Sequence, residues 1–368
     1  MLRQTTAVFA LALLVGGGNL AAQRQGTFLT PGNDESTTRV GARGANFLEI
    51  GVGARAQALG GAFTSLASGA SAMYWNPAGI ASMDGVIAAF TSTRLFDDLD
   101  IDHSFAAVGI PFAGGGIGLS YIRLSSGDIP RTNEDFPAGD DPQFGSTFEW
   151  AGTAIGLHYG RRLTDRLQVG FSGKLITEGL DNASATWWGV DVGTIFNTGL
   201  YGITLGAVLA NIGPSASIEG GLVNQRVTAR EAFPVSLPIE FATVSYQLPT
   251  TFRFSVLTNL VGGADALLTP SGTHGFVLAV DLNDAVDTDL QTSIGAEYNF
   301  REIIFLRGGK KFVNEAKDDD FRSFGDFLSF GGGIRLPVFG RTLMFDYAYT
   351  NMGELQNVQV FSFELGGN

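Results

Sequence analysis

Histidine is the first residue type to examine for metal binding or acid–base catalysis, and this chain has only His103, His158 and His274. The three lie in different segments, and no pair has the spacing of metal ligands. No Gly-x-Ser-x-Gly nucleophile motif occurs. The absence of cysteine excludes thiolate metal sites and disulfides. The sequence therefore predicts a protein with no catalytic site, no cofactor and no bound metal.

The stretch FDDLDIDHS places Asp98, Asp100 and Asp102 at alternate positions, as at the start of a calcium-binding loop. Such a loop needs a glycine where this chain has His103 and a glutamate where it has Gly109. We therefore interpret the stretch as a solvated acidic turn.

Arg55 carries a more specific chemistry, because a cation enclosed by protein needs carboxylate partners. The candidate partners are acidic residues on the polar faces of alternating segments: Asp191, Asp281, Glu297 and Asp346. We expect Arg55 to pair with one of them and so to anchor the segment that contains it.

The stretch SAMYWNPAGIA, residues 71–81, places three bulky side chains directly before a tight turn. An asparagine oxygen can cap a short helix, proline suits the first helical position, and glycine permits close packing. The expected motif is Tyr74, Trp75, Asn76, Pro77 and Gly79, with Met73 and its neighbours pressing against a wall. Whether this is only a structural joint or also a gate is left open by the residues.

The body that must position these residues is rich in β-structure. The 368 residues include 51 glycines and 29 phenylalanines, but only 16% are charged. Glycine eases bends and close strand approach, and aromatic residues cover pleated surfaces. The net charge of -13 opposes binding to phosphate backbones, so no nucleic acid partner is expected.

Residues 1–22 have the pattern of a cleaved secretory signal peptide, with Arg3 before a short apolar core and small residues at Ala21 and Ala22. Residues 23–45 are polar and are predicted to form a mobile arm. Residues 46–82 are rich in alanine, with spacing that fits short helices. Residues 83–368 form the remaining domain, and no later apolar run reaches the length of a membrane helix.

From about residue 85 the hydrophobic pattern has a period of two. In LQTSIGAEYNF, for example, Leu290, Ile294 and Tyr298 share one face and Gln291 and Glu297 the other. A soluble sandwich would show this pattern as well. Three features favour a membrane barrel: segments of about ten residues, polar opposite faces, and aromatic residues at strand ends.

Fifteen segments have this pattern: 85–95, 102–112, 115–125, 149–161, 166–179, 186–197, 202–212, 238–248, 251–261, 275–283, 290–300, 303–313, 327–337, 341–351 and 358–366. Bacterial single-chain barrels have even strand numbers. Segment 238–248 alternates poorly and follows two prolines, so we assign it to a long external loop that starts near Asn211. The prediction is an all-β, fourteen-stranded antiparallel transmembrane barrel in which residues 46–82 form a small N-terminal helical plug.

Residues 47–81 resemble the N-terminal signature of the PorV/PorQ family of outer-membrane proteins. Their NPAG element is also similar to the hatch of FadL-type outer-membrane transporters, whose fold is a fourteen-stranded barrel with an N-terminal plug. Residues 187–196 and 205–214 resemble strands of the same family. The resemblance implies a location in the outer membrane, in contact with its lipid.

Three functions follow as hypotheses. The first, implied by PorV/PorQ, is a non-enzymatic barrel that binds or shuttles exported proteins, as in type IX secretion. The alternative is a FadL-like plugged channel for hydrophobic small molecules, which an apolar region lined by Phe and Met between plug and wall would favour. The third is a secreted soluble β-protein, which would partition into water without detergent.

Overall fold

The computed structural model describes residues 42–95, 100–132, 134–139, 147–228, 236–241, 243–288, 290–312, 326–338, 340–351 and 357–366. The predicted signal peptide 1–22, most of the arm 23–45, Asp98 and residues 313–325 lie outside these residues. Within the described part, no helix has both the length and the apolar character needed to cross a membrane.

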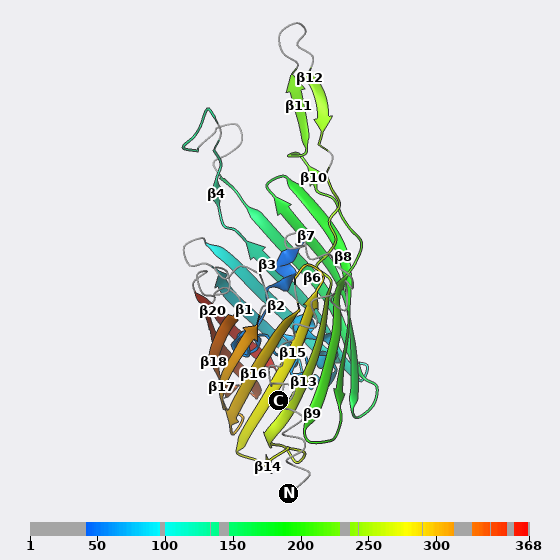
Figure 1. Cartoon of the computed structure of the whole chain (residues 1–368), viewed down its shortest axis with the longest axis vertical. Helices are drawn as coiled ribbons and strands as arrows, with labels where there is room; N and C mark the ends of the chain where they lie inside the picture. The colour runs from blue at the N-terminus through cyan, green and yellow to red at the C-terminus, as the bar shows by residue number, and fades with distance from the viewer. Residues whose placement is uncertain are drawn as a thin grey trace.

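Fourteen antiparallel strands form a closed barrel, as predicted (Figure 1). In order around the ring they are β1 (Ile87–Leu95), β2 (Ile101–Phe112), β3 (Gly115–Ser125), β6 (Trp150–Arg162), β7 (Leu167–Leu180), β8 (Ala183–Asn197), β9 (Ile203–Ile212), β13 (Thr251–Gly262), β15 (His274–Ala285), β16 (Gln291–Phe300), β17 (Ile304–Phe312), β18 (Asp326–Val338), β19 (Arg341–Asn351) and β20 (Asn357–Gly366). Pairing of β20 with β1 closes the ring, so none of these strands has a free edge.

The exclusion of 238–248 from the barrel is confirmed. Residues Ser236–Glu240 form β12, which pairs with β11 (Asn224–Thr228) in a separate hairpin between β9 and β13. This hairpin projects beyond one end of the barrel (Figure 1). The short strands β4 (Ile129–Pro130), β5 (Thr147–Phe148), β10 (Glu219–Gly220) and β14 (Thr269–Pro270) complete the described β-structure.

The barrel wall has apolar side chains on its outer face and polar side chains on its inner face, the reverse of a soluble protein. Across β3, β6 and β7 the side chains of Leu119, Leu157 and Phe171 are more than half exposed. Their polar neighbours Ser120 and His158 are buried on the opposite face. Apolar residues outside and polar residues inside are what a lipid-facing barrel requires, because only the lumen offers hydrogen-bond partners.

The two ends of the barrel differ in the length of their connections. At one end, here called the short-turn end, the connections are 113–114, 163–166, 198–202, 263–273, 301–303 and 339–340. At the other, the long-loop end, are the excursions between β3 and β6, between β9 and β13 and between β17 and β18. In outer-membrane barrels the short turns are periplasmic and the long loops extracellular.

Residues 44–83, here called the N-terminal segment, contain four short helices: η2 (Asn46–Glu49), α2 (Ala54–Ala58), α3 (Ala72–Trp75) and η3 (Pro77–Ser82). α2 contacts β17 to β20, whereas η3 contacts β3, β6, β7 and β8 on the other side of the ring. The segment therefore crosses the lumen between opposite walls before the chain enters β1. Its apolar side chains form one buried cluster with lumen-facing residues of the wall.

Candidate functional site

An ion network joins the N-terminal segment to the wall. Arg55 of α2 donates two hydrogen bonds to Glu297 of β16, from Nη2 to Oε1 at 2.7 Å and from Nε to Oε2 at 2.8 Å. Arg307 of β17 then bridges Glu297 and Asp346, with N···O distances of 2.6 Å to each carboxylate. Two arginines and two carboxylates thus neutralise one another inside the lumen, which is the condition for burying such charges.

Burial disfavours the charged form of Arg55, but the adjacent Glu297 carboxylate outweighs it and raises the arginine's pKa above its ordinary value. The guanidinium is therefore charged at every physiological pH. Of the four carboxylates considered from the sequence, Glu297 is the one that contacts Arg55 directly, and Asp346 is connected to it through Arg307.

Asp281 holds the segment in a different way. Its Oδ2 accepts the backbone N–H groups of Phe63 and Thr64, at 3.1 and 2.8 Å. Its Oδ1 accepts the hydroxyl of Ser255, which also lies 2.6 Å from the Ser65 hydroxyl. Asp281 is thus a buried acceptor for two backbone donors of a loop that has no strand or helix of its own there.

Asp191 does not contact the segment's arginine. It lies at a register shift between β8 and β9, where its Oδ1 accepts the N–H of Asn211 at 2.8 Å. Lys174 of β7 forms an ion pair with its Oδ2 at 2.9 Å. The hydrophobic pattern places Asp191 on the lumen face. It pairs with Lys174 and not with Arg55 because α2, which carries Arg55, lies against β17 to β20.

Asn76 fixes the turn between α3 and η3. Its Oδ1 accepts the N–H of Ala78 at 3.1 Å, and Pro77 occupies the first turn of η3. Its Nδ2 donates to the carbonyl oxygens of Thr64 and Thr194, both at 3.0 Å. One side chain therefore caps a helix, ties two parts of the segment together and binds the β8 backbone.

A row of four glycines receives η3 on the wall. Gly116, Gly160, Gly170 and Gly193 are cross-strand neighbours on β3, β6, β7 and β8. A Cβ at Gly160 would lie 2.7 Å from both the Pro77 oxygen and Ile80 Cγ1, and Cβ atoms at the other three would also overlap the segment. These residues, here called the glycine row, let the helix backbone lie directly on the sheet.

The bulky residues before the cap behave differently from one another. Met73 reaches the wall, where it occupies the space beside Gly109 and Gly118. Tyr74 and Trp75 instead bind the segment itself, donating to the carbonyl oxygens of Leu48 at 2.9 Å and Val52 at 2.8 Å. The expectation that all three press on the wall is therefore too simple, because two of them carry polar groups that need partners when buried.

Gly79, the last residue of the expected motif, has no room for a side chain. A Cβ there would overlap the carbonyl of Ala67 and lie 2.8 Å from the Cβ of Ala72. Its contact is thus within the segment, where it lets η3 pack on the preceding loop.

Sequence reasoning passed over three further residues of this interface. Arg253 of β13 places its guanidinium 5.3 Å from the ring centre of Tyr74 and 5.2 Å from that of Trp75. Glu178 accepts the N–H of Ala45, and Glu364 accepts that of Ala70 at 2.9 Å. Each is a charged residue on the polar face of an alternating segment, so the same rule that selected Glu297 would have found them.

Glu49 of η2 is the titratable group of the segment with the largest expected response near neutral pH. Burial, reinforced by the negative charge of Asp287, raises its pKa from 4.5 to about 7. The positive charges of Arg253 and Lys311 oppose this shift. Glu49 is therefore partly neutral at pH 7 where it lies in the barrel.

Within the described part of the chain, the histidines and acidic residues do not form a metal centre. Among the residues that the structure describes, no group of three His, Cys, Asp or Glu side chains lies close enough to hold an ion. His158 lies between two serines, with Nε2 2.7 Å from Ser120 Oγ and Nδ1 2.7 Å from Ser172 Oγ. This row joins β3, β6 and β7 across the lumen face.

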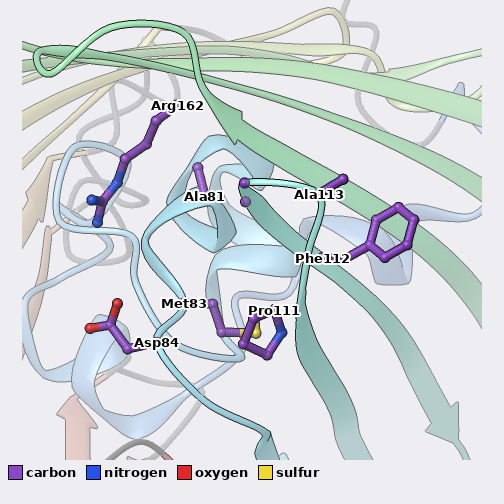
Figure 2. Close-up of a pocket in the computed structure, with 9 residues that line it drawn as sticks. Ala81, Met83, Asp84, Pro111, Phe112, Ala113 and Arg162 are labelled. Carbon is purple, nitrogen blue, oxygen red and sulfur yellow. The ribbon is translucent and has the colours of Figure 1, made fainter.

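A cavity of about 380 Å³ opens beside the end of the segment, at the short-turn end (Figure 2). It is lined by Ala81, Met83, Asp84, Pro111, Phe112, Ala113, Gly114, Gly115 and Arg162. The lining therefore combines apolar side chains with one acidic and one basic residue. The cavity adjoins the point where the chain passes from η3 into β1.

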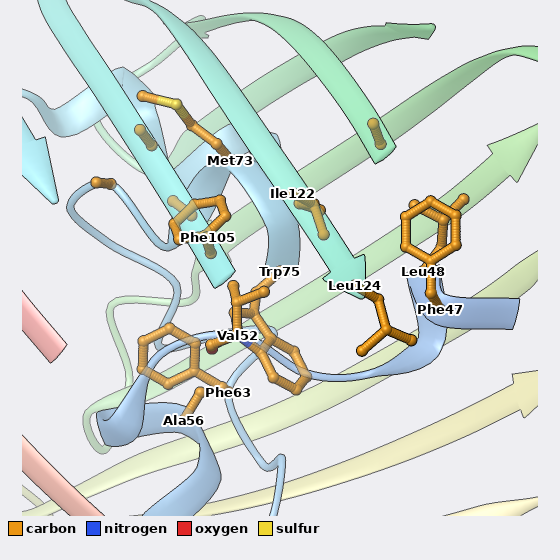
Figure 3. Packing of buried hydrophobic residues seen from close by; sticks show 14 of the residues in the cluster. Phe47, Leu48, Val52, Ala56, Phe63, Met73, Trp75, Phe105, Ile122 and Leu124 are labelled. Atoms are coloured by element: carbon orange, nitrogen blue, oxygen red, sulfur yellow. The ribbon is translucent and has the colours of Figure 1, made fainter. Parts of the chain in front are cut away.

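An apolar interface fills the lumen on the side of β2 and β3. Figure 3 shows Phe105, Ile122 and Leu124 of these strands gathered with residues of the segment, including Phe63 and Met73. The opposite wall carries Asp281, Glu297 and Arg307 in polar contacts with one another or with the segment. The segment thus has a polar attachment on one side and an apolar one on the other.

Comparison with known proteins identifies the fold. No protein-family model matches the chain, and no curated protein matches it. Among solved structures, the chain is similar to the CymD monoaromatic hydrocarbon channel, with a TM-score of 0.52, 13% identity and coverage of 86% of this chain and 96% of that one. It is also similar to the Pseudomonas putida toluene transporter TodX, with a TM-score of 0.51, 11% identity and the same two coverages. What the chain shares with these two structures is the fold of the barrel.

Proposed function

We propose that the chain is a non-enzymatic outer-membrane channel for hydrophobic small molecules, in which the N-terminal segment acts as the plug. The observation that carries the proposal is the buried apolar interface between that segment and the β2–β3 wall, inside a barrel whose outer face is lipid-facing. An apolar molecule that enters a polar-lined lumen would be desolvated only along this interface. The similarity of the fold to channels for aromatic hydrocarbons supports the same class of substrate.

The polar contacts on the opposite side suit a plug that stays attached while its apolar side moves. Arg55 and Asp281 tie the segment to β16 and β15 on that side, and Asn76 ties it to β8. The apolar contacts to β2 and β3 are non-directional and can be exchanged for contacts with a ligand. The cavity beside Met83 lies at the short-turn end of this route.

Binding or shuttling of exported proteins, which the likeness of residues 47–81 to PorV and PorQ implies, rests on that likeness alone. The comparison of folds supports the channel function instead. Export through a signal peptide at residues 1–22 remains part of the proposal, since an outer-membrane location requires it.

The test is accumulation of radiolabelled toluene by a Gram-negative host that makes the full chain, compared with the same host without it. We expect faster accumulation, and a further increase when the plug is loosened by Arg55→Met. Toluene accumulation equal to that of the control host, with the barrel correctly inserted, would refute the channel function. The control for insertion is resistance of the folded barrel to unfolding in cold detergent, read as a mobility shift on gels.

A further inference from the structure

The upper part of the apolar wall contains one polar pair. Toward the long-loop end, the lumen-facing positions of β20, β1, β2, β3 and β6 are almost all apolar or glycine: Val358, Val360, Leu95, Ile101, Phe105, Ile122, Leu124, Gly152 and Ala154. The exceptions are Thr91, whose hydroxyl lies 2.9 Å from Ser362 Oγ, and the pair formed by Thr93 of β1 and His103 of β2, which are direct cross-strand neighbours. Each side chain of this pair is 1% exposed.

Neither residue has its polar atoms satisfied by the protein that the structure describes. His103 Nδ1 and Nε2 and Thr93 Oγ1 are all buried without a hydrogen-bond partner among the described residues. A neutral imidazole offers one donor and one acceptor, and a hydroxyl offers both. Leaving such groups buried and unpaired costs about 1–3 kcal/mol each, so natural proteins keep them for a reason.

His158 is a buried histidine of the same barrel whose two ring nitrogens both have hydrogen-bond partners. It is equally buried on the lumen face of β6, and serine hydroxyls lie 2.7 Å from both of its nitrogens. The cross-strand neighbours of His103 are Thr93 and Leu124, and Leu124 can offer no such bond. The two histidines are therefore equally buried, but only His158 has hydrogen-bond partners among the described residues.

The position of the pair matches the route of the proposed channel. Phe105 and Leu124, which flank His103 along and across the wall, belong to the cluster that packs on the N-terminal segment (Figure 3). A molecule that displaces the segment from this wall would replace apolar contacts with its own body. It would then meet the unpaired polar atoms of Thr93 and His103 in a mainly apolar surface, since the nearby Thr91 hydroxyl already has Ser362 as its partner.

We propose that Thr93 and His103 form a polar docking point for small aromatic molecules that carry a single hydroxyl, as phenol does. A phenolic O–H donates to the unprotonated imidazole nitrogen of His103 and its oxygen accepts from the Thr93 hydroxyl, while the ring lies against Phe105 and Leu124. The inference rests on the proposed channel function and adds to it a preference among substrates, because a plain hydrocarbon leaves the pair unsatisfied.

The experiment compares phenol and toluene, which have similar size and differ in the hydroxyl. Equilibrium binding of each radiolabelled probe is measured to the full chain in lipid nanodiscs, with empty nanodiscs to subtract partitioning. We expect His103→Leu and Thr93→Val to lower the affinity for phenol about 3- to 10-fold, the worth of one hydrogen bond, and to change that for toluene less than 2-fold. Thr93→Val is nearly isosteric, so it remains informative if His103→Leu fails to fold.

The control variant is His274→Leu, which removes an exposed histidine that contacts Tyr298 Oη at 2.8 Å. It should leave both affinities unchanged. Equal losses for phenol and toluene in the two wall variants, or no loss in either, would overturn the docking point while leaving the channel function standing. Failure of the wild-type chain to bind either probe would overturn both proposals together.

Discussion

Replacing Gly170 by alanine adds one methyl group to the lumen face of β7, where the backbone of the segment already lies. The new Cβ would approach Pro77 C, Pro77 O and Ala78 N to less than 3.0 Å. These are backbone atoms that no change of rotamer can move. The wall cannot yield easily either, because Gly170 pairs with Gly160 on one side and Gly193 on the other. We therefore expect η3 to be displaced from the glycine row.

Overpacking of this kind costs about 1–3 kcal/mol, which raises the population of the displaced segment about 5- to 150-fold. The assay is hydrogen exchange, followed by mass spectrometry, of peptides that cover residues 77–83 in the detergent-solubilised barrel. Protection there comes from bonds such as Gly79 N–H to Asn76 O and Met83 N–H to Ile80 O. Exchange in the variant should accelerate within that range of factors, while exchange of the barrel strands stays unchanged.

The matched control is Gly173→Ala on the same strand. Gly173 lies on the outer face, and a Cβ there meets nothing within 4 Å. This variant should exchange like the wild type. The reasoning would be refuted if Gly170→Ala left the protection of residues 77–83 intact, or if Gly173→Ala reduced it equally.

Three further perturbations test the other attachments of the segment, each by the same exchange measurement. Glu297→Gln removes a counter-charge from Arg55 and Arg307 and should weaken docking of the segment by about 3–5 kcal/mol. The control Arg94→Met breaks an exposed 3.4 Å pair with Asp102 and should change docking by less than about 1 kcal/mol. Similar effects of the two variants would contradict the idea that the ion network holds the segment. Asn76→Ala removes the cap of η3 and should cost at least about 1–2 kcal/mol, so unchanged protection at Ala78 would count against the cap. The pKa of Glu49 is raised from 4.5 to about 7 when the segment is docked, so the contribution of Glu49 to docking is fully present below pH 4.5 and is lost as the pH rises through 7. The loss is at most about 3 kcal/mol. Glu49→Gln should abolish this pH dependence, and docking that becomes stronger between pH 5 and 7 would show that the assigned sign is wrong.

Most of the strand count was readable from local pattern. Alternation with period two depends only on neighbouring residues, so it marked fifteen candidate segments without reference to how they pair. The even strand number of such barrels required one segment to be removed, and poor alternation and two preceding prolines selected 238–248. The structure places 236–240 in an outlying hairpin. The short helices of the segment were also readable, because Asn76 and Pro77 act on the backbone beside them.

The partners across the lumen depended on the tertiary structure. The sequence determined that Asp191, Asp281, Glu297 and Asp346 share the polar face, since that follows from periodicity. It did not determine which of them meets Arg55, because closing the ring brings residues 55 and 297 together across 242 positions of the chain. The glycine row is a clearer case, as four glycines on separate strands align only once the register of β3, β6, β7 and β8 is set. Neighbouring residues determine which side chains share a face, whereas strand register and closure of the barrel depend on the pairing of all the strands.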